Sequence, residues 1–394
     1  MHDIKYPLGA SRHDALLDIV SGKTVRTGFA KPVFRMVSLV LLLISGNLAR
    51  AGEVSVSGFL SVVGGQVLDG SRTTPFNDIE CPCVITDWNH FSAYNRNFSL
   101  NQETRAGVRL NASMSESLTG VVQVDGRAQN NGSASLEWAY LSYVPRDDWV
   151  VQVGRKRIPI YFYSDFMDVG FAYPWVRPPQ ELYGWEVNNF NGVTVVKNGR
   201  VLDWNTRFSM FFGREASNDN VLSGYFYPGK HPDLTWYGIR GADMELTYEW
   251  LNMRAVYIES RVDLYGNAGP IMESAHQRIY GLAINIDYQD WLVRSEFSLF
   301  DRWRDFGYRS DAASVSAGQH IGKYTPMLSY SYFKDQNNYG ALASFNDHWA
   351  ISTRYDVTDT SSVKVQYDWI RELSPPGSTS GDARLISFSL DQVF

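Results

Sequence analysis

Apolar and polar residues alternate along most of the chain after residue 52, in short runs separated by turn residues. In the run 104–111, Ala106 and Val108 fall on one face, whereas Arg105 and Arg109 fall on the other. A period of two is typical of a β-strand whose two faces meet different surroundings. The pattern predicts sixteen strands, which begin at Val54 and continue at 104–111, 119–127, 136–144, 149–156, 192–197, 205–214, 236–248, 251–262, 278–288, 291–302, 313–322, 326–333, 349–357, 363–370 and 384–394.

The predicted connections alternate in length. Short turns follow even-numbered strands, for example at 198–203, 248–250 and 358–361, and long polar segments follow most odd-numbered strands, for example at 215–235, 264–277, 334–348 and 373–383. Short turns at one end, long loops at the other and an even number of strands are typical of a membrane-spanning barrel. The sequence therefore predicts an all-β fold, an antiparallel transmembrane β-barrel of about 16 strands.

Acidic–Trp pairs recur at four equivalent turns, each at the start of an odd-numbered strand: Asp148-Trp149, Asp203-Trp204, Glu249-Trp250 and Asp290-Trp291. An indole at a membrane–water boundary keeps its ring in apolar surroundings and its N–H near water. We expect the apolar face, with Leu282 and Ile284, to meet lipid, and the charged face, with Asp287 and Arg294, to enclose water. A soluble β-sandwich would show the same alternation with its apolar face inside. The Trp pairs and the two ends of the chain favour the membrane barrel.

The N-terminal 51 residues are predicted to be a signal peptide with an upstream segment, and residues 52–394 to be the barrel. Arg26, Lys31 and Arg35 precede an apolar run, and Ala49-Arg50-Ala51 follows it, which predicts cleavage after Ala51. A short buried helix is the alternative for the apolar run, which is shorter than the ~18 residues of a membrane-spanning helix. Residues 1–24 resemble neither signal nor strand, so translation could start downstream, for example at Val25.

The charge and the cysteine content limit the classes of partner that the chain could bind. Residues 1–51 hold seven Lys/Arg and three Asp, so their removal changes the formal net charge from −6 to −10. An acidic chain without a basic stripe argues against nucleic acid as a partner. Cys81 and Cys83 flank Pro82, and a local disulfide or two thiols are favoured over a metal site that would use His90. No metal and no cofactor is predicted.

The alternation stops between residues 158 and 190. An irregular segment of this length inside a compact domain is usually functional. It contains the charged residues Asp165, Asp168, Arg177 and Glu181 among several aromatic side chains. We predict a loop that folds into the barrel and constricts a water-filled pore. A surface loop that packs on its own aromatic residues is the alternative.

Arginines on the predicted inward face would line the pore opposite the acids of this loop: Arg105, Arg109, Arg127, Arg207, Arg240, Arg254, Arg294 and Arg354. Opposed charges across a constriction create a transverse field that sorts solutes by charge and polarity. The alternative for each arginine is a wall salt bridge, for example to Asp125, Asp287, Glu296 or Asp356. The basic excess predicts a weak anion preference near the constriction.

The last strand, RLISFSLDQVF at 384–394, ends on an aromatic residue and resembles the final strand of Gram-negative outer-membrane proteins. The stretch GRKRIP at 154–159, followed by Ser164-Asp165, Asp168-Val169-Gly170 and YPWVRPP at 173–179, resembles porins related to the phosphate-selective group. The resemblance implies a 16-stranded barrel in outer-membrane lipid, a long third extracellular loop folded inward, passive diffusion of small hydrophilic solutes and ions, and a homotrimer. The lysine cluster of strict phosphate selectivity is missing, because Lys156, Lys197 and Lys230 are scattered.

Two other functions remain open. A non-conducting barrel could serve as an adhesin or a structural anchor. An outer-membrane hydrolase would need a nucleophile held by a histidine, and no Ser or Asp motif stands beside the histidines of the predicted barrel, which are His90, His231, His276, His320 and His348. We therefore expect no catalytic residues.

Overall fold

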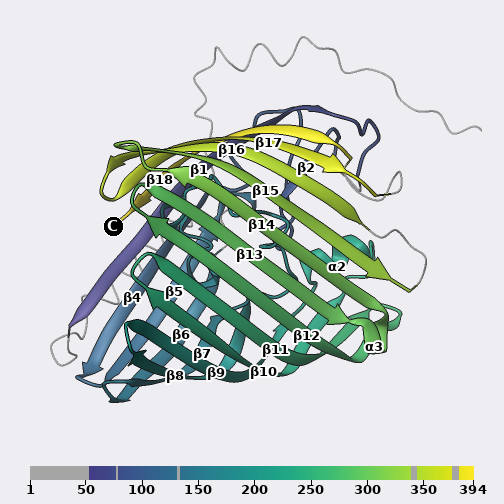
Figure 1. The fold of residues 1–394 in the computed structure, drawn as a ribbon. Helices are drawn as coiled ribbons and strands as arrows, with labels where there is room; N and C mark the ends of the chain where they lie inside the picture. The colour runs from purple at the N-terminus through teal and green to yellow at the C-terminus, as the bar shows by residue number, and fades with distance from the viewer. Residues whose placement is uncertain (1–52, 77–78, 131–133, 339–343, 375–380) are drawn as a thin grey trace, which may run out of the picture. The chain divides into compact units, whose positions relative to one another are not determined.

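The computed structural model describes residues 53–76, 79–130, 134–338, 344–374 and 381–394, so the predicted signal peptide lies outside the described residues. Sixteen strands form one closed antiparallel barrel, which β1 and β18 complete by pairing with each other (Figure 1). The barrel strands are β1 (Val54–Gly70), β4 (Arg105–Ser115), β5 (Leu118–Arg127), β6 (Ala134–Arg146), β7 (Trp149–Arg157), β8 (Asn189–Val201), β9 (Trp204–Ser217), β10 (Asp233–Tyr248), β11 (Leu251–Gly266), β12 (Gly269–Tyr288), β13 (Trp291–Arg302), β14 (Tyr308–Gln319), β15 (Tyr324–Asn337), β16 (Phe345–Thr358), β17 (Ser361–Glu372) and β18 (Ala383–Val393). The predicted fold class is confirmed.

Side chains alternate between the inside and the outside of this barrel. In β18, Ser387, Ser389 and Asp391 are buried on the inner face, whereas Ile386 and Phe388 are exposed on the outer face. A barrel in lipid needs an apolar outer face, and a soluble sandwich would place the same residues in a dry core. The distribution is therefore that of a membrane barrel.

Short turns join the strands at one end of the barrel, at 116–117, 147–148, 202–203, 249–250, 289–290, 320–323 and 359–360. Trp149, Trp204 and Trp291 begin strands that follow these turns, and Trp250 directly precedes β11. All four indoles therefore lie at the same end, as the acidic–Trp pairs predicted.

The prediction of a long loop at 264–277 is wrong. β11 runs to Gly266, β12 begins at Gly269, and Leu264 pairs with Met272 in the ladder between them. Register shifts on both sides of Leu264 break the period of two, so a continuous hairpin resembled a loop in the sequence. The hairpin extends the wall of the barrel at the end opposite the short turns.

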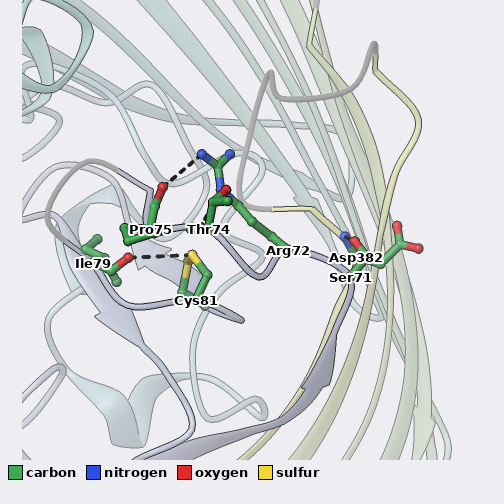
Figure 2. The surroundings of a disulfide bond; sticks show 8 residues. Ser71, Arg72, Thr74, Pro75, Ile79, Cys81 and Asp382 are labelled. Carbon is green, nitrogen blue, oxygen red and sulfur yellow. Dashed lines mark hydrogen bonds between the residues drawn. A yellow bond between two sulfur atoms is a disulfide. The ribbon is translucent and has the colours of Figure 1, made fainter.

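The long connection between β1 and β4 contains a hairpin of β2 (Val84–Asp87) and β3 (Ser92–Tyr94). Cys81 and Cys83 form a disulfide directly before this hairpin, and Figure 2 shows it beside the segment that starts at Ser71. Short helices occupy other connections: η2 (Ala128–Asn130), η3 (Ser164–Phe166), η4 (Gly170–Ala172), α2 (Val221–Phe226) and α3 (Trp303–Phe306). No helix in the described part of the chain is long and apolar enough to cross a membrane.

Residues 158–188 connect β7 to β8, and we term them the inner segment. Trp175 Nε1 donates a hydrogen bond to Ser329 Oγ of β15 at 3.0 Å, and the backbone N–H of Val176 donates one to Gln366 Oε1 of β17 at 3.0 Å. Ser329 and Gln366 lie on the buried face of strands far from β7 in the ladder. The segment therefore crosses the interior of the barrel.

Arg177 attaches this segment to the opposite wall. Its guanidinium lies 2.8 Å from a Glu103 oxygen and 3.0 Å from an Asp368 oxygen, and it donates a hydrogen bond to Ser387 Oγ at 2.7 Å. Arg177, Glu103 and Asp368 are all nearly fully buried. Burial disfavours the charged form of Arg177, but Glu103 and Asp368 outweigh that effect and raise its pKa. The charge of this arginine is therefore permanent and fully paired.

Asp168 attaches the segment to the other side. Its carboxylate pairs with Arg127 of β5 and Arg157 of β7, and its backbone carbonyl accepts a hydrogen bond from Arg105 Nε at 2.7 Å. Burial alone would raise the pKa of this carboxyl group, but Arg157, Arg127 and Arg105 outweigh burial and lower the pKa to about 2. Asp168 is therefore ionised at neutral pH and bound from several strands.

Replacing Arg177 by Met tests the first anchor. Loss of the guanidinium leaves Glu103 and Asp368 buried with one cation fewer, and breaking such a pair typically costs about 3–5 kcal/mol. We expect the free energy of unfolding, measured by urea titration in detergent micelles, to fall by that amount, and the inner segment to become cleavable by protease. The control is Arg200→Met, because Arg200 is 69% exposed beside Asp203 and an exposed pair contributes at most ~1 kcal/mol. Equal losses in the two variants would contradict the anchor.

Acid should release the second anchor. The pKa of Asp168 is lower in the folded state than in an unfolded chain, so its stabilisation is present above about pH 4 and is lost as the pH falls toward 2. We expect pepsin to cut the inner segment increasingly over this range. In Asp168→Asn the anchor is absent at every pH, so the ratio of wild-type to variant cleavage should rise toward one as the pH falls. A constant ratio would show that Asp168 does not hold the segment.

Candidate functional site

Only one of the four predicted loop charges is accessible from the lumen. Asp168, Arg177 and Glu181 are buried in ion pairs or hydrogen bonds with the wall. Glu181 accepts a hydrogen bond from Ser331 Oγ at 2.8 Å and lies 3.2 Å from His348 Nδ1. Asp165 is partly exposed beside Phe166, which is 48% exposed. Among the predicted loop charges, Asp165 is therefore the one that the wall leaves partly exposed.

Four of the eight predicted wall arginines hold the inner segment instead of facing open water. Arg105 and Arg127 bind Asp168, as described above. Arg254 donates hydrogen bonds to the Tyr161 carbonyl at 3.0 Å and the Phe162 carbonyl at 3.3 Å. Arg354 donates one to the Phe171 carbonyl at 2.6 Å. Arg105, Arg254 and Arg354 thereby satisfy backbone carbonyls that would otherwise be buried without donors.

Two further wall arginines form salt bridges. Arg294 lies 2.7 Å from Asp287, which matches the salt-bridge alternative. Arg207 lies 3.4 Å from Asp243 and remains 36% exposed. Asp243 also binds Arg254 at 3.1 Å, so one carboxylate serves two guanidinium groups. The guanidinium of Arg207 is therefore only partly neutralised by Asp243, and its side chain remains partly exposed.

The prediction that Arg240 lines the pore is wrong, because its side chain faces outward. Arg240 is 66% exposed, whereas Trp236 and Ile239 are fully buried on the inner face. Gly238 adopts a φ of 58°, and the register shifts between Tyr237 and Arg240. In a regular strand Arg240 would lie on the same face as Trp236, four residues earlier. The bulge adds one residue between them, so the side chain of Arg240 points to the opposite face.

Arg109 and Lys156 are two further inward cations. Arg109 lies over the Trp138 ring at 3.9 Å from its centroid and donates hydrogen bonds to Gln123 Oε1 at 2.8 and 3.0 Å. Lys156 donates a hydrogen bond to Gln152 Oε1. In the described part of the chain, neither cation forms an ion pair. Both are partly exposed and feel the charge of Asp165.

Asp165, Arg109, Lys156 and Arg207 therefore form the charged part of the narrowed lumen, and we term them the eyelet. Arg207 pairs with Asp243, whereas Arg109 and Lys156 form no ion pair with a described residue. Glu245 lies opposite Arg207 in the ladder and is a further carboxylate on this wall. It accepts a hydrogen bond from Asn252 at 2.7 Å. The weak anion preference near the constriction stays a prediction.

Several residues of the site were missed in the sequence. Lys156 was set aside as scattered, although its even position in 149–156 places it inside with Gln152. Arg157 and Glu103 lie at a strand end and in a loop, where alternation gives no signal. Lys364, which is fully buried, donates a hydrogen bond to the Gly170 carbonyl and lies 3.1 Å from Asp391. The alternation of β17 predicts that Lys364 lies on the inner face, but it gives no signal of this contact with the inner segment.

A cavity of about 580 Å³ lies at the end of the barrel opposite the short turns. Aromatic side chains from several connections line it, including Phe76, Trp88, Trp185 and Tyr225. Glu186 and Arg302, which pair at 2.6 Å, supply charge at its wall. The cavity is an aromatic vestibule on the lumen.

The described residues contain no group of His, Cys, Asp and Glu that could hold a metal ion. His348 has both ring nitrogens beside carboxylates, Glu181 at 3.2 Å and Asp368 at 2.9 Å. Its two contacts join Glu181 of the inner segment to Asp368 of β17.

No protein-family model matches the chain, and no curated protein matches it. Solved structures do match. The outer-membrane channel DcaP of Acinetobacter baumannii is 12% identical with a TM-score of 0.58, and the match covers 87% of this chain and 97% of that one. The anion-selective porin from Comamonas acidovorans is 10% identical with a TM-score of 0.54 over 87% and 99% of the two chains. A loop-deletion mutant of OmpT from Vibrio cholerae is 13% identical with a TM-score of 0.57 over 87% and 100%.

Identities this low establish a shared fold and leave the activity to be argued from the site. The matches span nearly the whole of each solved chain. The chain therefore has the fold of the outer-membrane porins.

Proposed function

We propose that the protein is an outer-membrane porin that lets small hydrophilic solutes and ions diffuse through a water-filled channel, with a weak preference for anions. One observation supports the proposal: the inner segment crosses a closed barrel, and its Asp165 lies in electrostatic range of the inward cations Arg109 and Lys156. A barrel with ~16 strands is wide enough to hold water, so a crossing segment sets the size limit. A non-conducting anchor has no need for cations held in the lumen without carboxylate partners.

The proposal includes the location and the assembly. Residues 1–51 act as a signal peptide with its upstream segment, residues 52–394 form the barrel, and residues 158–190 include the third extracellular loop, folded inward. One OmpT structure of Vibrio cholerae is described as a trimer, and the shared fold supports a homotrimer here. N-terminal sequencing of the mature protein and native mass measurement test these two statements.

Conductance separates a porin from an anchor. The purified protein in a planar bilayer should give stepwise single-channel currents in KCl solutions. A stably inserted barrel that gives no current would contradict the proposal. The reversal potential in a salt gradient then reports the preference between Cl⁻ and K⁺.

Arg109→Glu and Lys156→Glu test the eyelet. A unit charge a few ångströms from a passing ion contributes about 1 kcal/mol in water-like surroundings, which corresponds to roughly fivefold in the permeability ratio. We expect each substitution to shift the Cl⁻/K⁺ permeability ratio toward K⁺ by about that factor or more.

Arg240→Glu is the matched control, because it reverses the same charge on the outer face of the same barrel. Its reversal potential should equal that of the wild type. A shift in the control as large as that in Arg109→Glu, or unchanged selectivity in both eyelet variants, would disprove the assignment of the eyelet.

A further inference from the structure

A charged pocket lies on the outer surface of the barrel wall, away from the lumen. It has a volume of about 600 Å³ and includes Arg240, Arg261, Arg278 and Arg304, with Glu259 and Asp305 as its carboxylates. We term it the outer arginine pocket. Strands β10, β11 and β12 and helix α3 provide these residues, all of which lie in the described part of the chain.

The alternation of the strands shows that this pocket faces outward. In β11, Ile258, Ser260 and Val262 are buried on the inner face, so Glu259 and Arg261 lie on the outer one. In β12, Gln277 and Ile279 are buried inside, so His276 and Arg278 lie outside. The bulge at Gly238 adds Arg240 to the same face.

The pocket holds more positive than negative charge. Arg240 lies 2.8 Å from Glu259, which His276 also contacts, and Arg304 lies 3.7 Å from Asp305. Arg261 donates hydrogen bonds to the Ser274 carbonyl at 3.2 Å and to Ser274 Oγ at 3.0 Å. Arg278 lies opposite Glu259 and Asp301 in the ladder, but neither Arg261 nor Arg278 forms an ion pair with any described residue. Two guanidinium groups on this outward surface thus have donors that no carboxylate occupies.

The apolar outer face of the barrel begins directly beside this pocket. Glu259 pairs with Arg278 in the ladder, and the next outward pair is Tyr257 with Tyr280, about 7 Å away along the strands. These two rings lie 5.2 Å apart and are followed by Leu282, which is 48% exposed. Aromatic residues of this kind mark the boundary between head groups and acyl chains. The outer arginine pocket therefore lies at the level of lipid head groups.

We propose that the outer arginine pocket binds an anionic membrane lipid through a phosphate on its head group, while the acyl chains lie over Tyr257, Tyr280 and Leu282. Guanidinium groups bind phosphate oxygens through paired, charge-assisted hydrogen bonds. Arg261 and Arg278 provide the donors, and Arg240 and Arg304 are held at the rim by their carboxylates. The proposal rests on the membrane location within the proposed function and is independent of conductance.

The test compares the wild type with the double variant Arg261→Gln/Arg278→Gln in a neutral detergent. The probes are dioctanoyl phosphatidic acid, dioctanoyl phosphatidylcholine and inorganic phosphate, and native mass spectrometry measures binding. We expect the wild type to bind phosphatidic acid about tenfold or more tightly than the double variant, and to bind phosphatidylcholine no better than the variant does. Arg200→Gln, at the short-turn end, should bind phosphatidic acid as the wild type does.

Three outcomes would overturn the proposal. Equal binding of phosphatidic acid by the wild type and the double variant would exclude these arginines. Binding of inorganic phosphate as tight as that of phosphatidic acid would show a site for small anions and not for lipid. Dissociation of an oligomer in the double variant would show that a second copy of the chain covers this surface.

Two controls separate loss of the lipid site from misfolding of the barrel and from failure of the proposed channel. Heat-modifiable migration of the double variant on a gel establishes that its barrel is folded. Its single-channel currents should equal those of the wild type, because the pocket lies outside the lumen. A wild type that binds lipid but conducts no ions would contradict the proposed channel and leave the lipid site standing.

Discussion

The pairing of every backbone amide is the constraint from which this structure follows. Inside a hydrocarbon layer an unpaired N–H or C=O has no water to bond with, so a spanning sheet must close on itself. Here β1 and β18 close the sheet through eleven paired positions. The ladder runs from Phe59, which is opposite Val393, to Gly70, which is opposite Ala383. Closure defines an inside and an outside, and the period of two then assigns each side chain to water or to lipid.

Closure alone would produce a wide tube, and ion pairs convert it into a narrowed one. Asp168 and Arg177 are both buried, and each binds groups from more than one strand. Buried pairs are poor sources of net stability compared with apolar packing, but they select one geometry strongly, because a misplaced partner leaves a charge unpaired. We infer that these charges fix where the inner segment lies, which in turn determines how Asp165 faces Arg109 and Lys156.

The strand count and the two faces of the sheet were predictable from the sequence because both depend on local alternation. The contacts of the inner segment were not, because Arg177 and its partner Asp368 are 191 residues apart in the chain and no periodicity links them. Alternation also failed where the register shifts. The period of two predicts a loop at Leu264 and an inward side chain for Arg240, and both predictions are wrong because these residues lie beside irregular pairings in β10 and β11.

The bulge at Gly238 has a consequence for how such a barrel can change. With its φ at 58°, this glycine allows β10 to contain one more residue than β11 at the bulge, while Trp236 and Ile239 on either side remain buried. The period of two would place Arg240 on the inner face if this part of β10 were one residue shorter. A single residue in the backbone thus decides which side of the wall carries this guanidinium.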